Sequence, residues 1–486
     1  MRKYVLLLGV LTLAGCDLGP GPVQPKISLP AAWQEQSAAV PTAWPAADWW
    51  RSFGSDELNR LVVEAQANNL DIAAAAARVD QAEAQLRVTG ASLYPLVNFT
   101  SNLQQRGPAG DPKLIEGSGS SSSLSSDLGG GSASSKQRTT ASIGLSASYE
   151  LDFWGKNRDN VNASKAALQS SQFDRETVAL TVTSGVASTY LQIMTLRDRI
   201  ALAKQNLANA EAVEKVVASK ARNGAVSALD LAQQQAQVSA QQAAIPPLEL
   251  QEKQAKNALA LLLGRNPEQL QLSGSGMQGI TLPVVGSGMP SGLLTRRPDI
   301  QKAEADLRSA NANLLAARAA MLPTIDLSST ISLEAIAANL AFGGAGAAYT
   351  AAASLVQPIF DAGQLKAQKD VAAGKQLELV QTYRSSILNA LSDVENALAS
   401  IDSLKTQQQW QEAQVGQANT AFTLAQAQYR AGSTELLPVL DAQRTVFQAQ
   451  DSRLTILLSQ YQAAVSLYKA LGGGWQAETK VAAAQP

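Results

Sequence analysis

An internal repeat constrains the fold of this 486-residue chain more than any other feature. Residues 70–95 (LDIAAAAARVDQAEAQLRVTGASLYP) align with residues 298–323 (PDIQKAEADLRSANANLLAARAAMLP), 228 positions later. Further along, LDFWGK at 151–156 aligns with IFDAGQ at 359–364, and from there the spacing is 208. Similarity over so much of the chain predicts two related structural halves.

Both halves show the same order of patterns. Each predicts a helix, a strand, a loop, a strand, a very long helix, a tight turn and a returning helix. The predicted elements are strands at about 95–105, 140–153, 323–334 and 348–359, long helices at 156–223 and 364–431, and returning helices at 228–264 and 437–470. The predicted organisation is a signal peptide at 1–15, an N-terminal extended segment at 16–68, the first repeat at 69–265, a connector at 266–297, the second repeat at 298–470 and a C-terminal tail at 471–486.

The predicted strands have one apolar face. In residues 140–153, Ile143, Leu145 and Tyr149 alternate with small polar residues such as Ser146. A half-buried sheet shows this pattern, and so does a strand of an outer-membrane barrel, which is apolar toward lipid and polar toward the lumen. Four strands cannot close such a barrel, and open edges in lipid leave backbone groups unpaired. The barrel interpretation therefore requires several copies of the chain.

The N-terminus has the features of a bacterial export signal. Arg2 and Lys3 precede a short apolar run, which ends in LAGC at Cys16. This pattern is typical of a lipoprotein signal, in which the cysteine carries acyl chains that tether the protein to lipid. An ordinary signal peptide with an incidental cysteine is the alternative. Asp17 fits less well, since this residue retains lipoproteins in the inner membrane of some bacteria.

The composition excludes several classes of function. The net charge is −1, which argues against a nucleic-acid partner. The chain contains no histidine and one cysteine, so it lacks the commonest general base and the commonest metal ligand. No nucleophile motif or phosphate-binding loop occurs. We therefore expect no enzyme, no cofactor and no metal site.

Several stretches, in this order, resemble the TolC-like outer-membrane efflux proteins and especially their lipoprotein branch. They are WWRSFGSDELNRLVVEAQANN, YPLVNF, LDFWGKNR, NALALLLGRNP, RRPDIQKAEADL, QPIFDAGQ and YRAGSTELLPVLDAQRTVFQAQ. The resemblance implies a mostly helical fold with membrane β-structure: a homotrimer with a twelve-stranded outer-membrane barrel, four strands from each protomer, continuous with a long periplasmic helical barrel. It also implies a passive exit duct, lipid-anchored and inserted in the outer membrane. Its expected partners are outer-membrane lipid, a periplasmic adaptor and an inner-membrane pump of the RND type.

The same resemblance assigns roles to the two helical turns. Their expected adaptor-docking residues are Arg222, Asn223, Gly224, Arg430, Ala431, Gly432 and Ser433. The expected gate residues are Asp230, Tyr429 and Asp441. Pro438 and Thr434 replace charged residues of some relatives, so Leu436, Leu437 and Leu440 are expected as apolar closing contacts. For Asp230 and Asp441 the alternative is a solvated acidic residue favoured by the dipole at a helix start.

Two other functions compete with the efflux duct. One is the exit duct of a type I protein-secretion system. The other is a lipid-anchored structural coiled-coil protein of the envelope, which would need no amphipathic strands. The expected substrate of the efflux duct is a drug or another small molecule.

Overall fold

The computed structural model describes residues 28–34, 44–106, 138–286, 288–336 and 346–475. The described chain divides into two compact units. A β unit contains Gln85–Ser164 and Asn311–Gly374, and a helical unit contains Pro22–Ala84, Lys165–Ala310 and Lys375–Pro486. Cys16 lies outside the described residues.

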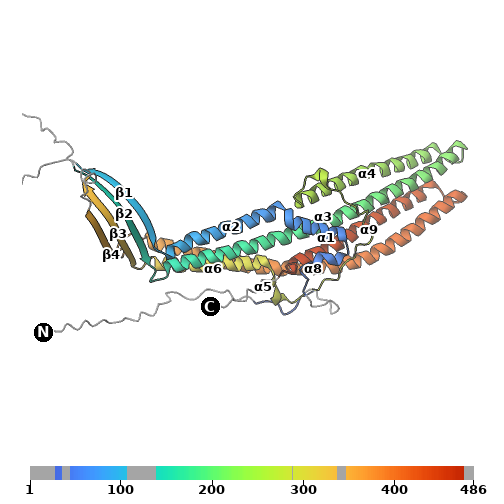
Figure 1. Cartoon of the computed structure of the whole chain (residues 1–486). Coiled ribbons are helices and arrows are strands. Elements are labelled where there is room, and N and C mark those ends of the chain that lie inside the picture. The colour runs from blue at the N-terminus through green and yellow to red at the C-terminus, as the bar shows by residue number, and fades with distance from the viewer. Residues whose placement is uncertain (1–27, 35–43, 107–137, 287, 337–345, 476–486) are drawn as a thin grey trace, which may run out of the picture. The chain divides into compact units, whose positions relative to one another are not determined.

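The β unit contains one antiparallel sheet of four strands in the order β1-β2-β3-β4 (Figure 1). The strands are β1 (Leu96–Arg106), β2 (Arg138–Leu151), β3 (Thr324–Ile336) and β4 (Gly346–Val356). Apolar side chains on the alternating positions are exposed, among them Phe99 and Tyr349. Within the described part of the protomer, these apolar side chains are therefore accessible.

The sheet preserves the sequence repeat in its register. Leu96 of β1 pairs with Ser148 of β2. Their counterparts, at the spacings of 228 and 208 residues, are Thr324 and Val356, and these two residues also pair. Both halves therefore form the same hairpin, and the β2–β3 pairing joins the first hairpin to the second.

An aspartate starts the long helix after each hairpin. The Asp152 carboxylate accepts hydrogen bonds from the backbone N–H groups of Asn157 and Arg158 at the start of α3 (Lys156–Arg222). The Asp361 carboxylate does the same for α8 (Gln364–Ala431) through Gly363 and Leu365. These backbone bonds lower the pKa of Asp361. Each connection thus satisfies N–H groups that have no partner within the helix.

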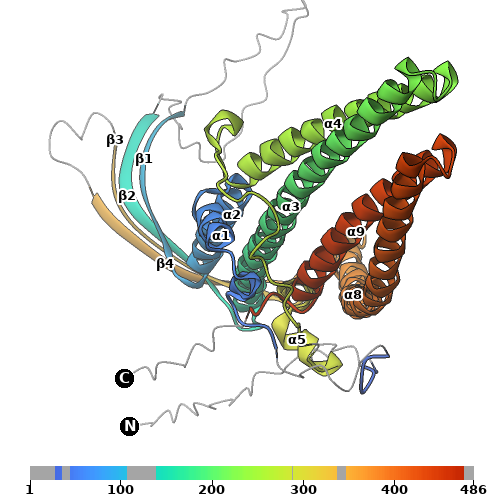
Figure 2. The same cartoon turned by 90° about the vertical axis from the view of Figure 1, so that its right-hand side faces the viewer.

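The helical unit is built mainly from paired helices, shown in Figures 1 and 2. Its α-helices, including four that extend into the ranges of the β unit, are α1 (Asp56–Asn68), α2 (Leu70–Gly90), α3, α4 (Ala228–Leu262), α5 (Leu293–Arg296), α6 (Pro298–Ala319), α8 and α9 (Leu436–Ala470). Helix α4 continues through Pro246 and Pro247. None of the helices in the described ranges has both the length and the apolar character that a membrane crossing requires.

The main core gathers residues that are far apart in the sequence. Trp49 stacks on Tyr468 of α9 with ring centroids 4.7 Å apart, and Phe53 is fully buried beside them. Leu191 and Met194 of α3 belong to the same buried cluster. Apolar burial therefore fixes the N-terminal segment and the connector against the helix pairs.

The returning helices end in equivalent hydrogen bonds. Asn69 Nδ2 donates to the Leu262 carbonyl at 2.8 Å, and Arg297 Nη1 donates to the Ala470 carbonyl at 3.1 Å. Arg297 is the counterpart of Asn69 at a spacing of 228, and Ala470 is the counterpart of Leu262 at 208. The two halves thus keep the same backbone contact although the side chains that make it differ.

Candidate docking turns and channel gate

Two helical turns carry most of the residues with expected site roles. Helix α3 ends at Arg222 and α4 begins at Ala228, while α8 ends at Ala431 and α9 begins at Leu436. Gly224 and Gly432 have φ values of 71° and 76°, in the left-handed region that favours glycine. This left-handed conformation ends each long helix. Figure 2 shows the α3–α4 and α8–α9 hairpins and their turns.

The residues expected to dock an adaptor are all exposed in the protomer. In the first turn they are Arg222, Asn223 and Gly224, and in the second they are Arg430, Ala431, Gly432 and Ser433. Each turn therefore presents one arginine and a length of accessible backbone. Such a surface suits a polar partner, since guanidinium groups and free backbone groups both form hydrogen bonds.

Tyr429 is buried near the second turn and contacts a lysine from the other hairpin. Lys220 Nζ lies 4.2 Å from the centroid of the Tyr429 ring and donates a hydrogen bond to the Tyr429 carbonyl. The Tyr429 hydroxyl is buried and has no hydrogen-bond partner among the residues that the structure describes. Burial raises the pKa of Tyr429, and the negative charge of Asp230 raises it further. Tyr429 therefore stays neutral, and Lys220 joins the last turns of α3 and α8.

A small apolar cluster surrounds this contact and is called the tip cluster below. Its buried members are Val213, Val217, Tyr429, Leu436, Val439 and Leu440. Leu436 and Leu440 are only 2% and 1% exposed within one protomer. Their burial does not fit the expected role as contacts that close a pore, because both side chains already fill the space between the hairpins. Leu437, at 53% exposure, is the only one of the three expected leucines that another chain could reach.

The two expected gate carboxylates differ in their surroundings. Asp230 belongs to a capping box at the start of α4, where its carboxylate accepts hydrogen bonds from the backbone N–H and the hydroxyl of Ser227. This is the helix-start role that the sequence left open for Asp230. Asp441 is exposed and lies 3.7 Å from Arg444 on the same helix. Of the two, Asp441 has the carboxylate more accessible to another chain.

Sequence reasoning missed the residues that pack behind Tyr429. Val213, Val217 and Lys220 lie three or four positions apart on α3 and thus share one face of this helix. That spacing was the available signal. It could not identify Tyr429 as the partner, because the contact joins two helices 209 positions apart in the chain.

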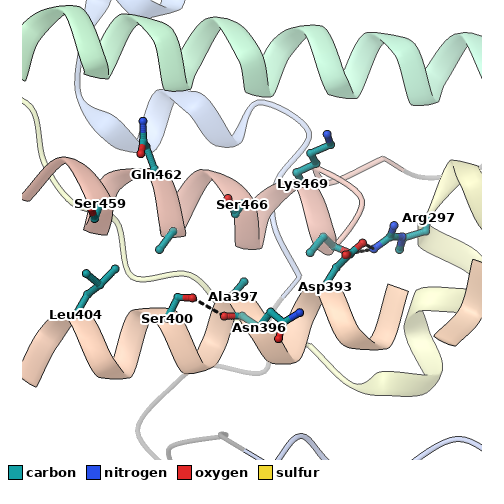
Figure 3. Close-up of a pocket in the computed structure, with 12 residues that line it drawn as sticks. Arg297, Asp393, Asn396, Ala397, Ser400, Leu404, Ser459, Gln462, Ser466 and Lys469 are labelled. Atoms are coloured by element: carbon teal, nitrogen blue, oxygen red, sulfur yellow. Dashed lines mark hydrogen bonds and ion pairs between the residues drawn. The ribbon is translucent and has the colours of Figure 1, made fainter. Parts of the chain in front are cut away.

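A separate groove of about 530 Å³ runs between α8 and α9 (Figure 3). Small and polar side chains line most of it, including Asn396, Ser400, Ser459 and Ser466. Arg297 lies at one end and is neutralised by Asp299 and Asp393, at 2.6 and 3.0 Å. Because its charge is already paired, Arg297 offers little attraction for an anionic ligand. Within the described ranges, no three or more His, Cys, Asp or Glu side chains come together as a metal site.

Comparison with known proteins places these features in one family. The family model of the outer membrane efflux protein matches residues 61–265 and 289–473. The chain is 42% identical to the pyoverdine export outer membrane protein OpmQ of Pseudomonas putida, with 98% of each chain covered. It is 30% identical to the probable outer membrane lipoprotein SilC of Salmonella typhimurium, with 97% of this chain and 99% of SilC covered.

Solved structures agree with the family match. The open-state structure of the MtrE outer membrane channel of Neisseria gonorrhoeae has a TM-score of 0.80 and 27% identity, covering 94% of this chain and 98% of MtrE. The predicted fold class, efflux-channel function and outer-membrane location are therefore confirmed. This chain belongs to the outer membrane efflux protein family.

Proposed function

We propose that the chain is the exit duct of a tripartite efflux pump and works as a homotrimer. The observation that carries this proposal is the four-stranded sheet. In the described ranges, its edge strands β1 and β4 each pair on one side only, and its apolar face is exposed. Such edges are costly in lipid, where each unpaired backbone group costs several kcal/mol. Three copies supply twelve strands, which is within the range of closed outer-membrane barrels.

The proposed partners are a periplasmic adaptor and an inner-membrane pump of the RND type. The exposed residues of the two turns support this assignment, and Arg222 and Arg430 are the proposed polar contacts. Acylation of Cys16 anchors the N-terminus in outer-membrane lipid. The name of SilC, a related lipoprotein, supports this anchor.

The proposed cargo is a small organic molecule. The chain is 42% identical to a protein named for pyoverdine export and 31% identical to the cation efflux protein CusC of Escherichia coli. The greater similarity to the pyoverdine protein supports an organic cargo over a metal ion. Without histidine, the chain also lacks the side chain that most often binds transition metals.

The proposed gate lies near the second turn. Asp441 and Leu437 are its accessible residues, and Tyr429 with Lys220 holds the two hairpins in place behind them. Three copies of Asp441 around an axis form a negative ring, which attracts cations and repels itself when the ring narrows. Asp230 is assigned to the helix cap.

Conductance in planar bilayers tests the gate. We expect Asp441→Ala to increase the leak conductance of the purified channel and the antibiotic uptake of cells that carry the variant. Asp402→Ala, which alters an exposed carboxylate on a different helix, α8, is the matched control and should behave as the parent. Unchanged single-channel behaviour of Asp441→Ala removes this residue from the gate.

Deletion of the protein tests the proposed function in cells. We expect greater sensitivity to small toxic molecules and normal secretion of proteins. Lost secretion of a protein with unchanged sensitivity would instead favour the type I secretion duct.

A further inference from the structure

Helices α3 and α9 are joined by an ion pair far from the two turns. Arg199 Nε and Nη2 on α3 donate to the two carboxylate oxygens of Asp451 on α9, at 2.7 and 2.9 Å. The pair therefore connects the first helical hairpin (α3–α4) to the second (α8–α9), both visible in Figure 2. Two parallel hydrogen bonds between a guanidinium and a carboxylate are stronger and more directional than a simple charge contact. Arg199 lies 23 residues before the last residue of α3, about 35 Å along the helix.

The ion pair lies where the main core ends. Leu196, one turn before Arg199 on α3, belongs to this core, and Leu457 of α9 packs against it. Among the described residues, the next buried cluster shared by both helical hairpins is the tip cluster, which includes Val213 of α3 and Leu440 of α9. The two hairpins are thus joined at the core and again at the turns, with the ion pair at the core end of the stretch between.

In this stretch, each helical hairpin is held together by contacts of its own. Gln234 Nε2 of α4 donates to the Ala210 carbonyl of α3 at 2.8 Å. Gln411 Nε2 of α8 donates to the Ala449 carbonyl of α9 at 2.9 Å. One buried cluster lies here, and its members come from α8 and α9 alone: Ala418, Val446, Phe447 and Ala449. Each hairpin can therefore keep its own structure when the two hairpins separate.

A buried amide without a partner lies in the same stretch. Gln443 of α9 is fully buried, and neither polar atom of its side chain has a hydrogen-bond partner among the described residues. It follows Leu440 by three positions and precedes Asp451 by eight, so the three residues share one face of α9. An unpaired buried amide costs free energy that contact with water would restore. The closed stretch thus contains a group that favours separation of the hairpins.

The shared fold of the two halves does not require the ion pair. The counterparts of Arg199 and Asp451 at the spacing of 208 are Gln407 and Ala243, which cannot form one. Both halves nevertheless keep long helices of 67 and 68 residues and returning helices of 35 residues each. The pair is therefore specific to the contact between the two helical hairpins of one chain.

We propose that Arg199 and Asp451 form a second fastening of the gate, which the helical hairpins must break in order to separate beyond the turns. Lys220 and Tyr429 form the first fastening, at the turns themselves. When the first fastening opens alone, the second one limits how far the separation extends. Arg199 and Asp451 are thus positioning residues, which act on the gate through the helices. The inference deepens the proposed function, because it rests on a gate near the second turn.

Asp451→Asn tests the second fastening in the full-length channel in planar bilayers. The leak is measured as the ratio of open to closed time without the other parts of the pump. We expect it to rise about three- to fivefold, as loss of a partly exposed ion pair allows. Glu249→Gln is the matched control, because it removes an ion pair with Lys204 that joins α3 to α4 inside one hairpin. Its leak should equal that of the parent.

Two further variants show whether the effect belongs to the pair. The charge exchange Arg199→Asp with Asp451→Arg should return the leak to near the parent value. Arg199→Gln with Asp451→Asn should leak no more than either single variant, since all three lack the same contact. Thermal unfolding of the same samples separates a loosened gate from a damaged fold.

Combination with changes nearer the turns orders the two fastenings. We expect Lys220→Met with Asp451→Asn to raise the leak by more than the product of the single effects, because either fastening alone still limits separation. Gln443→Met should lower the leak, since it removes the unpaired amide and keeps a side chain of similar length.

The possible results separate this inference from the proposed function. An unchanged leak in Asp451→Asn, in a channel whose leak responds to Asp441→Ala, overturns the second fastening and leaves the gate intact. Multiplied effects of Arg199→Gln and Asp451→Asn also overturn it, because the two residues then act separately. An unchanged leak in Asp441→Ala, Lys220→Met and Asp451→Asn alike, in a protein that conducts ions, contradicts the proposed gate itself.

Discussion

The two halves of the chain keep the same backbone contacts but use different side chains to secure them. The hairpins share one register, and both returning helices end in a hydrogen bond to an equivalent carbonyl. Asn69 makes this bond in the first half. Arg297 makes it in the second, and two aspartates neutralise its charge.

The turns differ in the same way. In the first turn, the capping box of Ser227 and Asp230 secures the start of α4. In the second, Glu435 makes no capping bond through its side chain, and the buried Leu436 and Leu440 hold α9 instead. The counterparts of these leucines at the spacing of 208 are Ala228 and Ala232. The repeat thus conserves the path of the backbone, while the chemistry of each end has diverged.

The largest expected effect is at Arg297. Its side chain is 11% exposed and holds Asp299, Asp393 and the Ala470 carbonyl. Burial alone would lower the pKa of Arg297, but the two aspartates raise it, so the guanidinium stays charged. We expect Arg297→Ala to destabilise the fold by about 4 kcal/mol, because it leaves the buried Ala470 carbonyl unpaired, at about 1–3 kcal/mol, and removes charge-assisted hydrogen bonds to two partly exposed aspartates, at about 1.5–3 kcal/mol.

Asn69→Ala sharpens this comparison between the halves. It removes the equivalent neutral bond and a helix cap, with an expected loss of about 1–2 kcal/mol. Thermal unfolding in detergent should therefore show a lower midpoint for Arg297→Ala than for Asn69→Ala. The reverse order would mean that the charged contact is no stronger than the neutral one.

The tip cluster gives the next largest effect. Leu440→Ala should cost about 3 kcal/mol, because it opens a cavity at a side chain that is 1% exposed. Hydrogen exchange should become faster in residues 213–217 and 429–440. Leu229→Ala, at the exposed counterpart of Leu437, should change stability by less than about 0.5 kcal/mol. Equal exchange in both variants would contradict the assignment of the leucines as the anchor of the second turn.

A smaller effect is expected at the helix starts. Ser227→Ala removes the capping box and should cost about 1 kcal/mol. Glu435→Ala, at the equivalent position of the second turn, removes no capping bond and should leave stability unchanged. Hydrogen exchange of the first turn of α4 and of α9 measures both. Similar losses in the two variants would show that the turns are secured alike.

The smallest expected effect concerns acid stability. The Glu57 carboxylate accepts hydrogen bonds from Ser273, the Gly274 backbone and Tyr190. Burial raises the pKa of Glu57, but these bonds outweigh burial and lower it below 4.5. The stability that the ionised Glu57 carboxylate contributes to the fold is therefore fully present above pH 4.5. It is lost as the pH falls through the lowered pKa.

Glu57→Gln tests this contribution of the ionised carboxylate. We expect a loss of less than about 1 kcal/mol at neutral pH, because the site is partly exposed. The difference in unfolding midpoint between the parent and Glu57→Gln should shrink below pH 4.5. A constant difference down to pH 3 would contradict a role for the ionised carboxylate.

Several features could be predicted from the sequence because they depend on local or periodic signals. The repeat predicted two equivalent hairpins, the alternation of Ile143, Leu145 and Tyr149 predicted a sheet with one apolar face, and Gly224 and Gly432 marked the ends of the long helices. Each signal operates within a few residues or at a fixed spacing, so one sequence is enough to detect it.

Only the tertiary structure decided which side chains meet between hairpins. Leu436, Leu437 and Leu440 share a helical pattern in the sequence, yet two are buried in the tip cluster and the third is exposed. The pairing of Lys220 with Tyr429, and the capping role of Asp230, also required coordinates. The physical reason is that contacts between distant helices depend on how the helices pack and rotate, which the local pattern of either helix leaves open.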